Sequence, residues 1–234
     1  MKRLIGTLLL AGIAMTTMAR SEPAETGSTA PGSADARFQA LYTREWAWRQ
    51  QQFPGLDDED RVASANDNRL PAVDAKTQAT RLAYWQDVLR LLAAIAPKDL
   101  SAANQVNYAV YKPQIENLAA DVRFRAYEMP LNSDSQFWSD LAFMANRPLK
   151  SAAEAENYIA RLNDVPRYFD EQIVNMRAGL KRGFSVPRAV LGGRDVSIST
   201  YIEVDNAQDS PFYKPFKQLP TNIPATAQAK LQAD

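Results

Sequence analysis

The sequence contains no histidine and no cysteine among its 234 residues. Catalytic zinc sites are built from histidine, cysteine and carboxylate side chains, and nearly always include at least one of the first two. A zinc hydrolase centre therefore cannot form from this chain by itself, and neither can a triad of the Ser-His or Cys-His type. Without cysteine there is also no disulfide framework, so the folded state must be stabilised by packing.

Motifs that bind phosphate or activate a nucleophile are also missing. The chain has no G-x-S-x-G, no G-x-x-x-x-G-K-[ST], no G-x-G-x-x-G and no S-x-x-K. Asp170 and Glu171, on the longest predicted helix, are the remaining pair of neighbouring carboxylates to consider. Neighbours in sequence diverge by about 100° around a helix, so these two carboxylates would not face one bond. The sequence predicts no catalytic residue, no metal ligand set and no cofactor site.

Charge of one sign is not in excess, because 27 basic residues balance 27 acidic residues. A protein that binds nucleic acid normally has a basic excess or a basic stripe, and neither is present. The composition therefore predicts no nucleic-acid partner. An apolar fraction of 46% is enough for a sizeable core in one domain or two small ones.

Residues 1–19 have the pattern of a cleavable secretory signal. Lys2 and Arg3 precede the apolar run LIGTLLLAGIAM, and Thr17-Met18-Ala19 offers a small-residue cleavage site. A membrane anchor is the alternative, but the run is shorter than the roughly 20 residues that span a bilayer and has no stop-transfer flank. We expect a periplasmic or secreted protein with no membrane span after the signal is cleaved.

Residues 20–36, rich in Ser, Pro, Gly, Thr and Ala, are predicted to be a disordered linker, and residues 37–234 to be an all-α, multi-helix region. Apolar residues at helical spacing predict helices from Phe38 to before Pro54, from Lys76 to Ala96, from Ser101 to beyond Val122, from Ser135 to Ala145, after Pro187, and from Ala225 to Asp234. In the third of these helices the predicted core includes Val106 and Val110, and Pro113 either bends it or begins a new helix. Residues 196–204 alternate like a strand and are equally compatible with a helix, whereas residues 205–224 have the prolines of a loop.

One of the two rings of Trp46 and Trp48 is expected to pack inward, and the neighbouring Arg44 and Arg49 are expected to cover it from the solvent side. Stacking of these rings on a ligand is the alternative.

The rest of the chain is organised around one long helix over residues 151–183. Ser151 and Glu154 form a capping box, and Gly183 follows the last turn as a stop signal. Pro166 inside the pattern predicts a kink or two helices that meet end to end. Apolar residues that alternate three and four apart predict one buried stripe, formed by Ala155, Ile159, Leu162, Pro166, Phe169, Ile173, Met176 and Leu180.

The segment YIARLNDVPRYFDEQIVNMRAGLKRGFSVPRAV, residues 158–190, resembles the bacterial "domain of unknown function 885" family (DUF885). The likeness extends to REWAWR at residues 44–49, to residues 81–118, and to SPFYKPF at residues 210–216. The resemblance implies a helical fold related to zinc peptidases. Members of the family carry a His-Glu-x-x-His metal motif in a later part of a much longer polypeptide, and this chain has no histidine. The resemblance therefore implies an incomplete part of a larger helical peptidase-like fold.

Two functions stay open at this point, and whether the chain is an enzyme stays open with them. In the first, the chain is the exported, non-catalytic amino-terminal portion of a zinc-peptidase-like protein and forms a helical wall of a peptide cleft. Its partners would be a peptide substrate or the missing carboxy-terminal catalytic half, and zinc is expected only in a full-length relative. In the second, it is a standalone periplasmic helical binding or scaffold module. The first function predicts exposed apolar surface, and the second predicts a closed core.

Three polar residues in the family-like segment are candidates for substrate contact. They are Asn175, Arg177 and Arg188. No motif assigns them this role, and a structural or surface role is the alternative for each.

Overall fold

Every regular element in the computed structural model is helical, over the described residues 32–54 and 67–233. The predicted signal, residues 1–19, lies outside the described residues. The α-helices are α1 (Ala34–Gln52), α2 (Ala75–Ala93), α3 (Ala102–Arg123), α4 (Ser139–Met144), α5 (Ala152–Lys181), α6 (Val196–Ile202) and α7 (Ala225–Ala233), and the 3-10 helices are η1 (Pro97–Asp99), η2 (Ala126–Glu128), η3 (Arg188–Leu191), η4 (Ala207–Asp209) and η5 (Pro211–Gln218). An isolated bridge between Leu131 and Gln136 is the sole β pairing in the described ranges. The predicted all-α fold is therefore confirmed.

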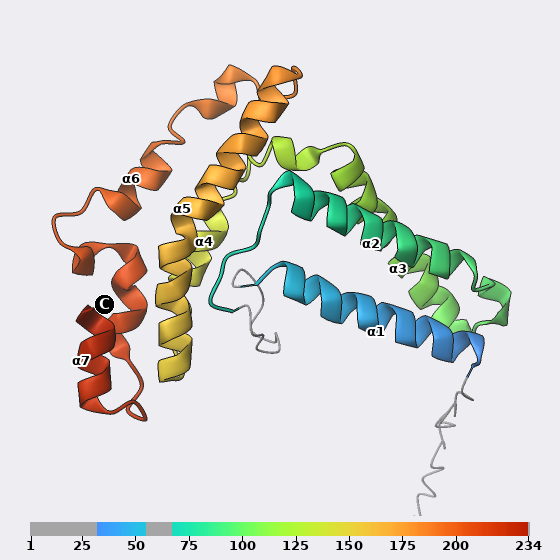
Figure 1. Ribbon diagram of the computed structural model, residues 1–234, viewed down its shortest axis with the longest axis horizontal. Helices are drawn as coiled ribbons and strands as arrows, with labels where there is room; N and C mark the ends of the chain where they lie inside the picture. Colours follow the sequence, from blue (N-terminus) through green and yellow to red (C-terminus); the bar gives the residue numbers. More distant parts are fainter. Residues whose placement is uncertain (1–31, 55–66, 234) are drawn as a thin grey trace, which may run out of the picture.

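The elements are arranged on two sides of α5, as Figure 1 shows. Helices α1, α2 and α3 pack together on one side, while α6, η5 and α7 lie on the other. In the part of the chain that the structure describes, no helix combines the length and apolarity needed to cross a bilayer.

The α1–α2–α3 unit has a core of its own, centred on Phe38, Leu92 and Ile115, which are fully buried. Its first helix begins at Ala34, a little earlier than the predicted start at residue 37, because the Ser33 hydroxyl accepts a hydrogen bond from the Ala36 N–H. The linker predicted over residues 20–36 therefore ends before Ala34.

One tryptophan of α1 packs inward, as predicted. Trp48 stacks on Tyr84 with ring centroids 3.7 Å apart, whereas Trp46 is 53% exposed. The prediction that arginines cover the inward ring is only partly right, since the Arg49 guanidinium lies over the exposed ring of Trp46 and not over Trp48. The inward ring is covered by protein, which favours the packing interpretation over ligand stacking.

A second core joins α4, α5, η5 and α7. Ala155, Tyr158, Phe216, Ile223 and Leu231 are buried in it. The Tyr158 hydroxyl donates a hydrogen bond of 2.8 Å to the Phe212 carbonyl, which ties α5 to η5. The loop predicted over residues 205–224 is thus partly wrong, because the 3-10 helices η4 and η5 occupy much of it.

Helix α5 begins as the sequence predicts. The Ser151 hydroxyl accepts a hydrogen bond from the Glu154 N–H at 3.2 Å, and the Glu154 carboxylate accepts one from the Lys150 N–H at 2.7 Å. The helix continues through Pro166 as a single element, so the alternative of two helices meeting end to end is excluded. Helix α3 likewise continues through Pro113.

The predicted apolar stripe of α5 is wrong at Pro166 and Leu180, which are exposed, Leu180 by 67%, whereas Phe169 and Met176 are partly buried against the second core. The fully buried residues of this half are Tyr168, Gln172, Asn175 and Gly179. Polypeptide backbone packs on the last two of them, which is why this side of the helix end is polar or lacks a side chain. Val106 and Val110 of α3 were predicted in the core and are exposed as well. Residues 196–202 form helix α6, which decides between strand and helix for this stretch.

A close joint connects the α1–α2–α3 unit to the end of α5. Gly179 lies so near η2 that a Cβ atom there would be 2.6 Å from the Glu128 carbonyl oxygen and 2.7 Å from that of Phe184. Arg182 donates to the buried Glu128 carboxylate and to the Phe124 carbonyl. The chain reaches this joint through Arg125, whose φ of 59° is in the left-handed region. Only a residue without a side chain fits at position 179.

Candidate functional site

The polar side of α5 holds an extended backbone segment, residues 67–74, which we call the strap. The Asp164 carboxylate accepts a hydrogen bond from the Leu70 N–H at 2.8 Å, and Arg167 donates to the Leu70 carbonyl at 2.9 Å. One turn further along, the Glu171 carboxylate accepts from the Val73 N–H at 2.7 Å. Because these residues are three and four apart, they lie on one helix face. Backbone groups that would be unsatisfied in the interior are paired in this way.

The carboxylates of this face are held by Arg167. Its guanidinium donates to Asp164 at 2.6 Å and to Glu171 at 2.7 Å. Burial raises the pKa of Asp164, but the hydrogen bonds from Arg167 and from the Leu70 N–H outweigh it, so this pKa lies below its usual value. Asp164 therefore stabilises the fold above the pKa of the unfolded chain, and this contribution is lost as the pH falls through the folded pKa.

Arg81 of α2 fastens the other side of the strap. It is 2% exposed and donates to the Ala72 carbonyl at 2.9 Å and to the Gln52 carbonyl at 2.7 Å. Burial lowers the pKa of Arg81 to about 10, and Asp74 and Glu171 oppose this shift. Sequence reasoning did not single out Arg81, although its position four residues before the buried Trp85 places both on one helix face. The strap thus joins the two cores.

Asn175, a predicted substrate-contact residue, belongs to the same arrangement. It is 3% exposed, and its side-chain amide donates to the Val73 carbonyl at 2.8 Å. Arg177 and Arg188, the other two candidates, are both exposed. The structure therefore separates the three by environment: Asn175 holds the strap inside the fold, and the two arginines face solvent.

A groove lies between α5 and α7. Its volume is about 340 Å³, and it is lined by Ala152, Glu156, Ile159, Ala160 and Asn163 of α5 and by Ala227, Lys230 and Leu231 of α7. Its apolar lining residues lie between one acidic and one basic side chain. Within the described ranges neither Glu156 nor Lys230 forms an ion pair. The groove therefore offers small apolar side chains together with one acidic and one basic group.

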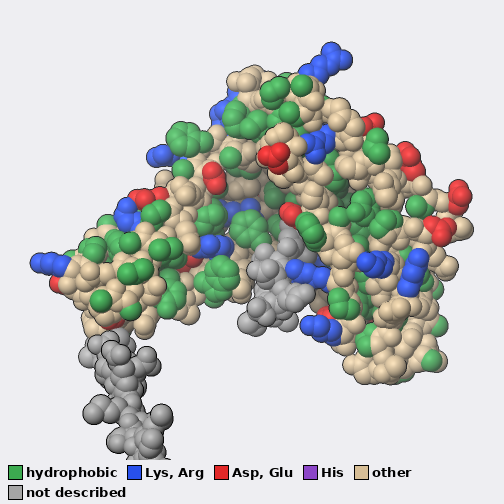
Figure 2. Space-filling view, turned by 180° about the vertical axis from the view of Figure 1, so that it is seen from behind, with side chains coloured by type: hydrophobic (Ala, Val, Ile, Leu, Met, Phe, Trp, Pro, Cys, Tyr) green, Lys and Arg blue, Asp and Glu red, His purple; other side chains and the backbone are tan. Residues whose placement is uncertain are grey.

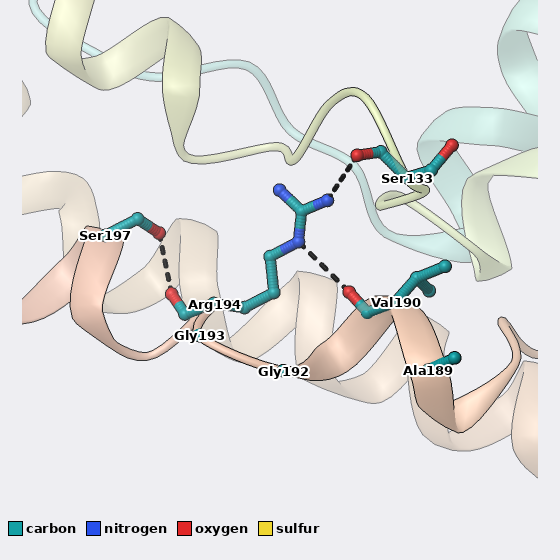
Figure 3. A pocket seen from close by; sticks show the side chains of 7 residues that line it. All are labelled: Ser133, Ala189, Val190, Gly192, Gly193, Arg194 and Ser197. Carbon is teal, nitrogen blue, oxygen red and sulfur yellow. Dashed lines mark hydrogen bonds between the residues drawn. The ribbon is translucent and has the colours of Figure 1, made fainter.

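A second hollow, of about 350 Å³, lies where η3 meets α6 (Figure 3). Arg194 is its charged residue, and each of its three guanidinium nitrogens donates a hydrogen bond to the protein. They donate to the Val190 carbonyl at 3.1 Å and the Ser133 carbonyl at 2.6 Å, both drawn in Figure 3, and to the Gln136 side chain at 2.5 Å. Arg194 therefore fixes the α6 segment to the loop before α4.

No metal-binding group is found among the described residues. In residues 32–54 and 67–233 no three His, Cys, Asp or Glu side chains come together in a way that could hold a metal ion. The donor set also does not fit catalytic zinc, because the whole chain lacks imidazole and thiolate.

The fold and its surfaces thus define an all-α protein with two helical cores and a groove between α5 and α7. The model of a family described as "Bacterial protein of unknown function (DUF885)" matches residues 49–234. The chain belongs to this family. Comparison with curated proteins and with solved structures gives no significant match.

Proposed function

We propose that this chain is the exported, non-catalytic amino-terminal portion of a zinc-peptidase-like protein. One observation carries the proposal: the match to the family covers residues 49–234, yet the chain has neither histidine nor cysteine, at least one of which catalytic zinc sites nearly always include. The metal and its general base would then come from polypeptide outside this chain. This portion would supply shape and contacts as a helical wall of a peptide cleft, and it would be inactive alone.

The groove between α5 and α7 supports the role of a wall. It is open, its lining includes Ile159, Ala160 and Ala227, and two opposite charges lie beside these apolar residues. We assign it as the place where the catalytic part of the longer polypeptide makes contact. The signal-like pattern at residues 1–19 supports export, to the periplasm or to the outside of the cell.

Exposed apolar surface also favours an incomplete assembly over a closed one. Large apolar side chains with an exposed fraction above half are Trp46, Val106, Val110, Phe124, Phe143, Val174, Leu180, Val196 and Ile202. Single exposed apolar residues are normal, and Figure 2 shows apolar side chains spread over one face of the molecule. Their recurrence along α3, α5 and α6 supports contact with further polypeptide.

Substitution of Ala160 by arginine tests the groove assignment. The new side chain would fill the groove, so we expect it to weaken binding of the separately purified catalytic part of a family protein, the part with the His-Glu-x-x-His motif, by about 100-fold. Binding would be measured by titration calorimetry with the two purified polypeptides.

The matched control for this experiment is Ala109→Arg, on the exposed face of α3 and away from the groove. It introduces the same side chain and should leave the affinity unchanged. Circular dichroism of both variants verifies that the helices are retained. If the catalytic part does not bind the unaltered chain, or binds the Ala160→Arg variant equally well, the assignment is wrong.

The alternative function is a standalone periplasmic helical binding or scaffold module. The observation that favours it is the presence of two cores with fully buried members, Phe38 and Ile115 in one and Ala155 in the other. Such a module would fold cooperatively and would not bind the catalytic part of any family protein. The titration above therefore separates the two functions.

A further inference from the structure

The sequence has no basic stripe, but folding brings basic residues from two segments together. The C-terminal end of α3 leads into η2, and the C-terminal end of α5 packs on η2, so residues 121–129 and 177–184 are neighbours. We call these two segments the corner, and Figure 1 shows them meeting at the top of the molecule. Its charged residues are five cations, Arg123, Arg125, Arg177, Lys181 and Arg182, and two acids, Asp121 and Glu128.

One of the two acids is already neutralised inside the corner. Glu128 is 4% exposed, its carboxylate accepts a hydrogen bond from Arg182, and it lies 3.5 Å from the guanidinium of Arg125. The remaining cations are exposed and form no ion pair within the described ranges; they are Arg123, Arg177 and Lys181. The corner therefore has a net positive charge, on a chain in which cations and acids are equal in number.

Two phenylalanine rings accompany the arginines of the corner. The guanidinium carbon of Arg123 is 4.8 Å from the centroid of the Phe124 ring, and that of Arg182 is 4.2 Å from the centroid of the Phe184 ring. The two pairs are adjacent, because Arg182 also donates to the Phe124 carbonyl at 3.2 Å. The helix dipole accounts for a cation at a helix end, but not for a phenylalanine beside it that is 64% exposed, as Phe124 is.

We propose that the corner binds the surface of an anionic phospholipid bilayer. Each Lys or Arg near such a surface contributes about fivefold to the affinity, because it is attracted to the lipid phosphates. An exposed Phe ring enters the boundary between headgroups and acyl chains, while the arginine beside it stays at the level of the headgroups.

The shape of the corner agrees with a flat partner. Figure 2 shows this end of the molecule as convex, with Lys and Arg side chains beside hydrophobic ones. The hydrogen bonds of Arg182 to Glu128 and to the Phe124 carbonyl hold the two segments together in advance, so little ordering is needed on contact. The inference goes beyond the proposed function and uses a surface other than the groove between α5 and α7.

Sedimentation of the purified full chain with lipid vesicles tests this proposal. We expect binding to vesicles of phosphatidylcholine and phosphatidylglycerol in equal parts, none to phosphatidylcholine alone, and a loss of binding as salt is added. The double variant Arg123→Glu/Lys181→Glu should bind about 100-fold more weakly, and neither substitution removes a hydrogen bond to Glu128. Phe124→Ser should weaken binding by about tenfold and leave its salt dependence unchanged.

The matched control is the double variant Arg37→Glu/Lys98→Glu, which changes the net charge by the same amount. Both residues are exposed, and both lie near the start of α3, where Asp35 accepts a hydrogen bond from the Ser101 N–H. The 22 residues of α3 place them about 33 Å from the corner. Vesicle binding should stay within about twofold of that of the unaltered chain, and circular dichroism would verify that both double variants keep their helices.

Three results would overturn the proposal. The first is no binding to the anionic vesicles at low salt, and the second is equal weakening by the two double variants. The third is binding to polyglutamate without binding to vesicles, with the binding abolished in Arg123→Glu/Lys181→Glu. The corner would then recognise an acidic polypeptide and not a membrane.

Discussion

Replacement of Glu45 by alanine should lower the free energy of unfolding by about 3–5 kcal/mol. Glu45 is fully buried in the α1–α2–α3 core. Its carboxylate accepts hydrogen bonds from Arg49 at 2.6 and 2.8 Å, from the Trp85 indole at 3.1 Å and from the Tyr111 hydroxyl at 3.1 Å. Without it these donors are left unsatisfied, and a cavity forms beside them.

Urea unfolding followed by tryptophan fluorescence would measure this effect, because the Trp85 indole donates to Glu45 and contacts the ring of Trp48, which lies on the same helix as Glu45. Glu116→Ala is the matched control. Glu116 also pairs with a cation four residues away, Lys112, but both side chains are exposed, so its loss should change stability by less than about 0.5 kcal/mol. Equal stabilities for the two variants would show that the Glu45 network contributes nothing.

Gly179→Ala should destabilise the protein by about 3 kcal/mol. A methyl group at this position would lie within 3 Å of two backbone oxygen atoms, those of Glu128 and Phe184, which cannot turn aside as a flexible side chain can. In an unobstructed helix the same change stabilises by up to about 1 kcal/mol, so the expected sign is the reverse of helix propensity. Thermal and urea unfolding would both register the change.

The control for this prediction is Gly192→Ala. Gly192 has a φ of −60°, and an added Cβ atom there meets nothing within 4 Å. Its substitution should be neutral or slightly stabilising. If Gly179→Ala is as stable as Gly192→Ala, the joint between η2 and α5 is looser than the structure indicates.

The boundaries of the helices could be predicted from sequence because local chemistry sets them. Ser151 and Glu154 mark the start of α5 through hydrogen bonds to backbone N–H groups within four residues. The buried side of α5 could not be predicted in the same way. Its apolar stripe is correct near Ala155, where side chains of the second core pack on it, and wrong at Leu180, which is exposed although η2 packs on the neighbouring Gly179.

The strap explains why the candidate site was only partly predictable. The Asn175 amide donates a hydrogen bond to the Val73 carbonyl, which lies 102 positions away in the chain, and the sequence around either residue does not indicate this contact. The sequence predicts Asn175 as a candidate for substrate contact because it is a polar residue in the family-like segment, and the structure shows in addition that its amide satisfies backbone of the same chain. Residues 196–202 are a short run with β-branched residues, which in sequence is compatible with both strand and helix. In the structure this run is helix α6, and a hydrogen bond from Trp138 to the Ser197 hydroxyl, which the sequence does not indicate, anchors it.

Assay of the pure, tag-free chain for bound zinc and for peptide hydrolysis tests the central claim most directly. The claim is that a member of the DUF885 family without histidine or cysteine contributes architecture and no catalysis. We predict less than stoichiometric zinc by elemental analysis and no cleavage of a mixed peptide substrate. One bound zinc per chain together with hydrolysis that a chelator abolishes would contradict it.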